Sequence, residues 1–258
     1  MFYLDKSKLG ESSPSAPRQP QIRHPQQTVP DWTQRFSELA QSAQDPRLRA
    51  FYQAGVVAAE TPIEEVPLLA VDFETTGLDP RKNSIISIGL LPLSLKRIRC
   101  AESRHWVLRP RSGLSRESVV IHGITHQALE QAPDLEEILD DLLPLMAGKV
   151  MVVHYRGIER PFLNEALKAR LGEGIEFPVI DTMELEARLH RSKKLSWWQK
   201  LLGRKPVSIR LAASRSRYGL PWYKPHHALT DALATAELLQ AQIAHHYSTS
   251  TPVSQLWQ

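Results

Sequence analysis

Two acidic residues, Asp72 and Glu74, end an apolar stretch that begins at Leu68. The stretch predicts a buried β-strand, and side chains two positions apart in a strand point to the same face. Neighbouring carboxylates raise each other's pKa unless a cation neutralises them, and Mg²⁺ or Mn²⁺ suits such oxygen ligands. A solvated strand end followed by an ordinary turn is the simpler explanation, so this pair alone is a weak indication of a metal site.

A histidine and a third acid occur close together near the C-terminal end of the sequence. His226 precedes a helix predicted over residues 228–244, and Asp231 lies in its first turn. A loop histidine and a helix carboxylate at this spacing can face one cleft. The alternative is a surface histidine and an acid favoured by the helix dipole. Considered together with Asp72 and Glu74, the shared site is the favoured interpretation.

The order and spacing of these motifs resemble the DnaQ-like (DEDDh) 3′→5′ exonucleases, the family that includes bacterial polymerase proofreading subunits. The resemblance covers about residues 67–244. The run Asp72-Phe73-Glu74-Thr75-Thr76-Gly77 is similar to the first motif, and His226 with Asp231 is similar to the third. The middle motif usually reads His-Asn-Ala-x-Phe-Asp. Here it reads His154-Tyr155-Arg156-Gly157-Ile158-Glu159, so a glutamate stands where an aspartate is expected.

The resemblance implies a site with two divalent cations, Mg²⁺ or Mn²⁺. Asp72, Glu74, Glu159 and Asp231 would hold them, and His226 would be the general base. The implied substrate-binding residues are Thr75, Thr76, Gly77, His122, Tyr155 and Arg156. An alternative for Glu159 is an acid that favours the start of a helix expected over residues 160–171. An alternative for Tyr155 and Arg156 is that they merely face solvent.

The activity that the resemblance implies is hydrolysis of the terminal phosphodiester of single-stranded or frayed DNA. It would release nucleoside 5′-monophosphates in repair, proofreading or turnover. Two alternatives stay open: an exonuclease for RNA or short oligonucleotides, and a non-catalytic module that binds nucleic acid or a polymerase. A DNA polymerase is a candidate partner. Only residues 247–258 follow the last predicted helix, which favours a free-standing nuclease.

Composition describes an ordinary soluble protein that can bury a full core, with 258 residues of which 42% are hydrophobic and 23% charged. The formal net charge of +4 permits a polyanionic partner such as nucleic acid. Cys100 is the only cysteine, which excludes an intrachain disulfide and a cysteine-cage zinc site. The sequence has no secretion signal and no apolar run of membrane-spanning length, so we expect a cytoplasmic protein without a membrane partner.

The resemblance implies an α/β fold of the ribonuclease H-like kind, a mixed five-stranded sheet flanked by helices with an N-terminal helical extension. The sequence pattern itself predicts an antiparallel meander followed by alternating helices and strands. We expect strands over residues 68–74, 84–93, 98–108, 149–154 and 178–182, and helices over 135–146, 160–171 and 228–244.

The predicted organisation has four parts: a disordered Pro/Gln-rich arm over 1–30, a helical extension and linker over 31–66, an exonuclease domain over 67–246 and a short tail over 247–258. Residues 183–224 form a basic helical insert that contains Trp197 and Trp198. Such an insert either follows a phosphate backbone and stacks bases, or packs its tryptophans on the domain, or binds a protein partner.

Overall fold

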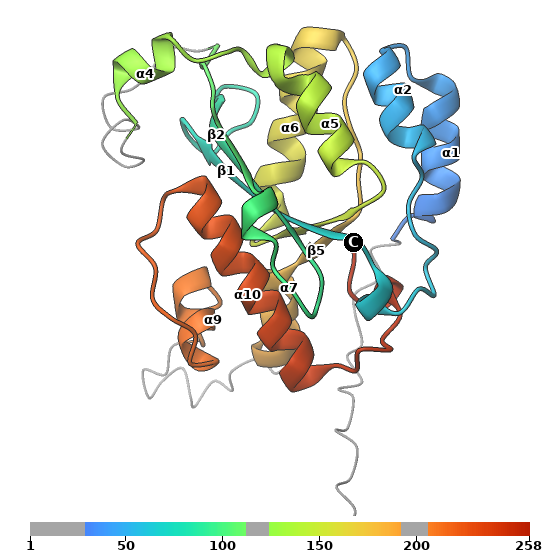
Figure 1. The fold of residues 1–258 in the computed structure, drawn as a ribbon, viewed down its shortest axis with the longest axis vertical. Coiled ribbons are helices and arrows are strands. Elements are labelled where there is room, and N and C mark those ends of the chain that lie inside the picture. The colour runs from blue at the N-terminus through green and yellow to red at the C-terminus, as the bar shows by residue number, and fades with distance from the viewer. Residues whose placement is uncertain (1–28, 112–123, 192–205) are drawn as a thin grey trace, which may run out of the picture.

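A computed structural model describes residues 29–111, 124–191 and 206–258. Most of the predicted arm, residues 1–28, lies outside these ranges. His122, Trp197 and Trp198 also lie outside them. The described residues form a five-stranded sheet with helices on both faces (Figure 1).

The sheet is mixed and has the strand order β3-β2-β1-β4-β5. β1 pairs with β2 and β2 with β3 in antiparallel fashion, whereas β1 with β4 and β4 with β5 are parallel. The predicted meander and the mixed five-stranded sheet are thus confirmed. The strands are β1 (Leu68–Thr75), β2 (Ile85–Leu93), β3 (Arg104–Val107), β4 (Val150–Val153) and β5 (Val179–Asp181).

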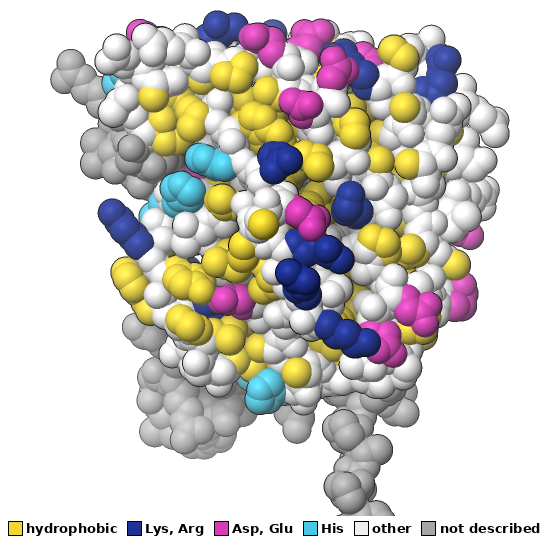
Figure 2. Space-filling model, in the orientation of Figure 1, with side chains coloured by type: hydrophobic (Ala, Val, Ile, Leu, Met, Phe, Trp, Pro, Cys, Tyr) yellow, Lys and Arg dark blue, Asp and Glu magenta, His cyan; other side chains and the backbone are white. Residues whose placement is uncertain are grey.

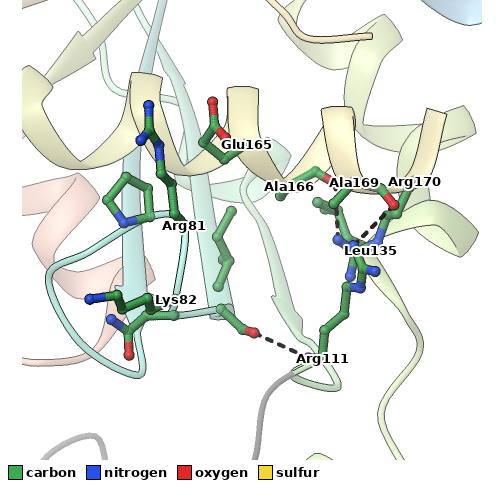
Figure 3. Close-up of a pocket in the computed structure, with 12 residues that line it drawn as sticks. Arg81, Lys82, Arg111, Leu135, Glu165, Ala166, Ala169 and Arg170 are labelled. Carbon is green, nitrogen blue, oxygen red and sulfur yellow. Dashed lines mark hydrogen bonds between the residues drawn. The ribbon is translucent and has the colours of Figure 1, made fainter. Parts of the chain in front are cut away.

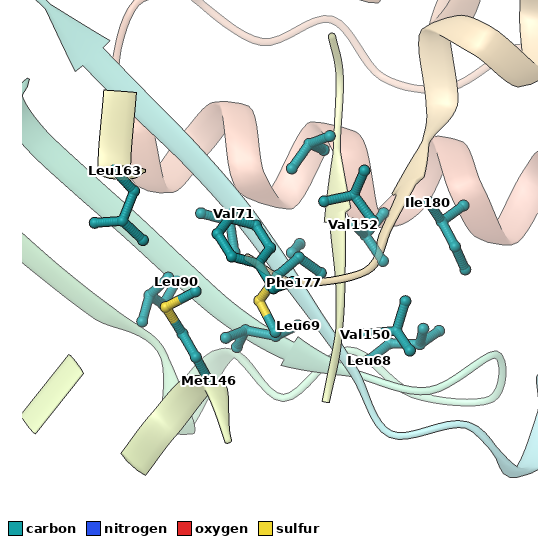
Figure 4. Close-up of a cluster of buried hydrophobic side chains, with 14 of the residues drawn as sticks. Leu68, Leu69, Val71, Leu90, Met146, Val150, Val152, Leu163, Phe177 and Ile180 are labelled. Atoms are coloured by element: carbon teal, nitrogen blue, oxygen red, sulfur yellow. The ribbon is translucent and has the colours of Figure 1, made fainter. Parts of the chain in front are cut away.

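The central strand β1 is buried on both faces, which explains why it begins as a continuous apolar run rather than an alternating one. Leu68, Leu69, Ala70 and Val71 are each at most 2% exposed. Figure 4 shows Met146 and Phe177 packed against this strand within the core. The strand is therefore a rigid base for the residues at its C-terminal end.

Two groups of helices cover the sheet (Figure 1). On one side lie α5 (Leu139–Met146) and α6 (Arg156–Leu171), with α1 (Trp32–Ser42) and α2 (Pro46–Gln53) beyond α5. On the other side lie α7 (Thr182–His190), α9 (Leu211–Arg217) and α10 (Ala228–His246). The short α4 (His126–Glu130) lies at the periphery. No helix among the described residues is long and apolar enough to cross a membrane.

The N-terminal helices α1 and α2 pack on the rest of the protein. Phe36 of α1 meets the Phe51 and Tyr52 rings of α2 at centroid distances of 5.6 and 5.3 Å. The Tyr52 hydroxyl accepts a hydrogen bond from the main-chain N–H of Glu176, and the Glu176 carboxylate pairs with Arg35. An aromatic cluster and polar contacts therefore fix these helices to the segment before β5.

Three predicted elements differ in the structure. The third strand covers only Arg104–Val107, because a turn at residues 94–97 and the 3-10 helix η3 (Cys100–Glu102) occupy the positions before it. The helix expected over 160–171 begins earlier, at Arg156, and contains Pro161 in its interior. The predicted helix over 135–146 divides into the 3-10 helix η4 (Leu135–Ile138) and α5.

The last residues of the chain pack against the sheet. The 3-10 helix η5 (Val253–Gln255) is followed by Leu256 and Trp257, which are 1% and 3% exposed. The main-chain N–H of Gln258 donates to the Val179 oxygen of β5 at 2.9 Å. The linker before β1 packs against this C-terminal segment. It contains the 3-10 helix η2 (Ile63–Glu65), and the main-chain N–H of Ile63 donates a hydrogen bond to the oxygen of Thr251.

Candidate active site

Three carboxylates, those of Asp72, Glu74 and Asp231, meet where β1 ends and α10 begins. Each contributes a ligand atom to a group in which all atoms lie within 4.8 Å of one another. The strand period places Asp72 and Glu74 on one face of β1, and α10 crosses this face with Asp231 in its first turn. The structure therefore brings together three of the four predicted ligands.

Gly89 allows α10 to lie directly on the sheet. It is the β2 residue opposite Asp72, and a Cβ atom placed on it would lie 2.4 Å from the carbonyl carbon of Ala228, the first residue of α10. Any larger residue would push the start of α10, and with it Asp231, away from β1. The sequence carried a signal for this contact, because an isolated glycine within a strand often marks a close backbone approach.

The fourth predicted ligand, Glu159, lies near the start of α6 and is 3% exposed. Its Oε2 atom has no hydrogen-bond partner among the residues described. Burial raises the pKa of Glu159 to about 8, with the charge of Asp181 contributing. A buried carboxylate oxygen without a partner is costly, so this environment suits a side chain that binds a cation.

The electrostatics of the cluster favour a cation as well. Burial, followed by the charges of Glu159, Glu74 and Asp231, raises the pKa of Asp72 well above its ordinary value. Burial and the charge of Asp231 raise the pKa of Glu74 to about 7. Burial also raises the pKa of Asp231. Four acids that resist ionisation together fit a divalent cation, which would relieve their repulsion.

His226 immediately precedes α10 and is tied to the acidic cluster. Its main-chain N–H donates to Oδ2 of Asp231 at 2.8 Å, and its φ of +70° is unusual for a residue other than glycine. The next residue, His227, caps α10 and stacks on His105 with a centroid distance of 4.8 Å. Figure 2 shows histidine side chains gathered near the start of α10. The His226 side chain is exposed beside the acids.

The predicted substrate-binding residues Thr75, Thr76 and Gly77 form the start of the β1–β2 turn. The Thr75 hydroxyl donates to the oxygen of Gly77, and the Thr76 hydroxyl accepts from the N–H of Ser84. A Cβ atom on Gly77 would lie 2.6 Å from the side-chain amide of Asn83, so a larger residue there would have to displace that amide. The turn also presents Leu78, which is 82% exposed and was not among the predicted site residues.

Tyr155 and Arg156, the other described candidates for substrate binding, are positioned by Asp181. The two carboxylate oxygens of Asp181 accept hydrogen bonds from the main-chain N–H groups of Tyr155 and Arg156, both at 3.0 Å. Asp181 also caps α7. Tyr155 has a φ of +100° and is 51% exposed. Asp181, which fixes the turn before Glu159, was not among the residues predicted from the sequence.

A cleft of about 480 Å³ opens beside the acids. Asp72, Asp231 and His226 line it together with His154 and the segment 219–223. The Nδ1 atom of His154 is hydrogen-bonded to the Thr182 hydroxyl at 2.8 Å. Burial lowers the pKa of His154 to about 4, which keeps it neutral.

Several arginines of the predicted basic insert are used in packing. Arg217 forms an ion pair with Glu186, a fully buried acid that also accepts hydrogen bonds from Tyr218 and Gln242. Arg215 is 4% exposed and pairs with Glu237. These two arginines therefore serve packing, whereas Trp197 and Trp198, on which the predicted alternatives for the insert depend, lie outside the described residues.

A second cavity, of about 400 Å³, lies between the β1–β2 turn and α6 (Figure 3). Arg81, Lys82, Arg111 and Arg170 line it, but none of the four acids does. Arg111 donates to the oxygen of Ala169, and Arg170 pairs with Asp134. Lys82 pairs with Asp79, so three of the four cations are already bound to protein groups, and we assign no part of the reaction to this cavity.

The model of the exonuclease family (RNase_T) matches residues 69–239, a span that contains all four acids and His226. The chain therefore belongs to the exonuclease family, in agreement with the predicted DnaQ-like membership. It is 30% identical over 179 residues to the PolC-type DNA polymerase III of Thermotoga petrophila. It is 29% identical over 183 residues to DNA polymerase III subunit epsilon of Treponema pallidum.

The matched regions differ in how much of each relative they include. The first match covers 69% of this chain and only 12% of the PolC-type polymerase. The second covers 71% of this chain and 79% of the epsilon subunit. The chain thus corresponds to a small part of the PolC-type relatives.

Solved structures confirm the ribonuclease H-like fold. The nuclease domain of 3'hExo, a DEDDh family member bound to rAMP, superimposes with a TM-score of 0.55 at 16% identity and covers 69% of this chain and 92% of that one. Exonuclease X in complex with 5' overhanging duplex DNA gives a TM-score of 0.52 at 22% identity, with 72% and 96% covered.

Proposed function

We propose that this protein is a metal-dependent 3′→5′ exonuclease that removes terminal nucleotides from single-stranded or frayed DNA. The observation that carries the proposal is the convergence of Asp72, Glu74 and Asp231 within 4.8 Å, beside the buried Glu159 and the exposed His226. Membership of the exonuclease family supports it. The name of the treponemal relative makes a DNA polymerase a candidate partner.

In this proposal the four acids and His226 have different roles. Asp72, Glu74, Glu159 and Asp231 would hold two divalent cations, Mg²⁺ or Mn²⁺. Such ions activate an attacking water and stabilise the leaving 3′ oxygen when bound. His226 would accept the proton of that water, since an imidazole suits a general base near neutral pH. The hydrogen bond between its main-chain N–H and Asp231 keeps the His226 main chain next to this acid, which supports that role.

A time course on a 5′-labelled single-stranded DNA and on its RNA counterpart tests the proposal. We expect a ladder that shortens from the 3′ end with Mg²⁺ or Mn²⁺, no cleavage with EDTA, and no cleavage by Asp72→Asn or Glu159→Gln. Preference for the RNA strand would change the assigned substrate. Binding of either strand without cleavage would favour a non-catalytic module instead.

His226 needs a separate test, because it is proposed to accept a proton, whereas the acids are proposed to bind the cations. His226→Ala should lower kcat while the response of the protein's melting temperature to Mg²⁺ or Mn²⁺ is retained. Thr230→Ala, a change in the same first turn of α10, is the matched control and should retain activity. Full activity of His226→Ala would show that this histidine is not the base.

A further inference from the structure

The cleft beside the acids has an exposed tryptophan in its wall. Trp222 lines the same cleft as Asp72, His226 and Asp231, yet it is 76% exposed. No hydrogen bond or ring contact joins its indole to any other residue that the structure describes. An indole offers a large flat apolar surface, so leaving it in water beside a reaction site points to a ligand that covers it.

The exposure of Trp222 is not a result of a loosely held loop, because both of its neighbours are anchored. On one side, the Pro221 oxygen accepts a hydrogen bond from Nη2 of Arg215 at 2.9 Å. On the other side, the Tyr223 hydroxyl donates to Oε1 of Glu237 at 3.0 Å. The loop therefore holds the main chain of Trp222 in place at the cleft.

Arg215 is the centre of this anchor. It is 4% exposed, and its guanidinium also donates to the Ala234 oxygen of α10 at 2.6 Å and pairs with Glu237 at 2.7 Å. Its Cζ atom lies 4.6 Å from the centroid of the Tyr223 ring. Since α10 also carries Asp231, one buried arginine connects the Trp222 loop with the helix that supplies an acid.

We propose that Trp222 is the stacking platform for one unpaired nucleobase of the strand whose end is hydrolysed. This inference rests on the proposed function. Every nucleobase has a flat face that stacks on an aromatic ring, whereas a base inside a duplex already has both faces stacked on its neighbours. The guanidinium of Arg215 is occupied by protein groups, so it does not read base edges here. The platform therefore selects unpaired strands and accepts any base.

Steady-state hydrolysis by Trp222→Ala and Trp222→Phe tests the platform. Alanine removes the stacking surface, and we expect KM for a single-stranded oligonucleotide to rise roughly 5- to 150-fold, from about 1–3 kcal/mol per stacked base. Phenylalanine keeps a ring and should restore most of the affinity. Val207→Ala is the matched control, since Val207 is 43% exposed and does not line the cleft.

Substrates with a single abasic residue at each of the last four positions locate the partner base. At one position the abasic substrate should raise KM of the wild-type enzyme as much as Trp222→Ala does. It should have no further effect in that variant, because both changes remove the same contact.

Unchanged KM in Trp222→Ala, or abasic effects that multiply with the substitution at every position, would overturn the platform while leaving the nuclease intact. A wild-type enzyme that hydrolyses no strand would instead refute the proposed function together with this inference.

Discussion

Oδ1 of Asp181 accepts a hydrogen bond from the main-chain N–H of Tyr155, which lies 26 positions earlier in the sequence. This contact joins the end of β5 to the turn that begins α6. Tyr155 has a left-handed backbone with a φ of +100°, which is unfavourable unless surrounding groups maintain it. The acid that follows four positions later, Glu159, thus depends on a carboxylate from another strand.

Asp181→Asn should disturb both stability and activity. An amide group keeps one acceptor oxygen but places its NH₂ against a main-chain N–H, so one buried donor loses its partner. We expect a loss of about 1–3 kcal/mol in the free energy of unfolding, measured by urea denaturation. The rate of hydrolysis should also fall, because the start of α6 carries Glu159.

Asp134→Asn is the control for this substitution. Asp134 pairs with Arg170 and caps η4, away from the four acids. Its replacement should lower stability but leave the rate of hydrolysis unchanged. Equal activities of the Asp181 and Asp134 variants at matched folded fractions would contradict a positioning role for Asp181.

Gly89→Ala should displace the first turn of α10. The added Cβ atom would lie 2.4 Å from the Ala228 carbonyl carbon, and the backbone must move to accommodate it. Because a displacement of about 1 Å can cost on the order of 100-fold in rate, we expect a loss of about that size in kcat.

The control for Gly89→Ala is Gly148→Ala. Gly148 has a φ of +69° and open space where a Cβ would be, so alanine there adds backbone strain of about 1–2 kcal/mol without any collision near the acids. Gly148→Ala should remain active. Normal activity of Gly89→Ala would mean that α10 tolerates the shift.

Stability in EDTA should fall as pH rises. The pKa of Glu74 is raised from its ordinary value of 4.5 to about 7 and that of Glu159 to about 8, so the folded state binds more protons than the unfolded chain between these values. The stability that these groups contribute is complete below about pH 4.5 and is lost through pH 7 to 8. Urea denaturation at pH 5 and pH 8 measures the slope, and Glu159→Gln should reduce it. A rise in stability from pH 5 to pH 8 would oppose this account.

Divalent cations should reverse that loss at pH 8. A ligand at 100 times its dissociation constant stabilises the folded state by about 2.7 kcal/mol, which a thermal melt with Mg²⁺ or Mn²⁺ detects. Asp72→Asn should be more stable than the wild-type protein in EDTA, since it removes one of the repelling charges, and should respond weakly to the cation. A wild-type melting temperature that is the same with EDTA and with either cation would argue against a metal site.

Local patterns in the sequence were sufficient to predict the elements that carry the acids. The apolar run before Asp72 predicted β1, and the apolar positions along α10 predicted the helix that contains Asp231. Both elements follow from periodicity within one segment. The five strands were expected for the same reason, although β3 is shorter than expected.

Contacts between distant segments could not be predicted in the same way. The start of α6 is set by Asp181, which lies at the end of β5, so the helix begins at Arg156 rather than at the predicted residue 160. The exposure of Trp222 depends on a buried arginine and on Glu237 of α10. The residue pattern of the loop itself does not indicate that it contacts these partners.

The packing of the last residues against β5 also affects how the protein meets other chains. The edge of a sheet normally offers unpaired main-chain groups to which a foreign strand can add. Here the N–H of Gln258 already binds Val179, and Trp257 forms a β-bridge with Ile180. A strand from another chain, in an aggregate or in a complex, would therefore have to pair with β3 at the opposite edge of the sheet. β3 has only 4 residues, so it provides a short pairing edge.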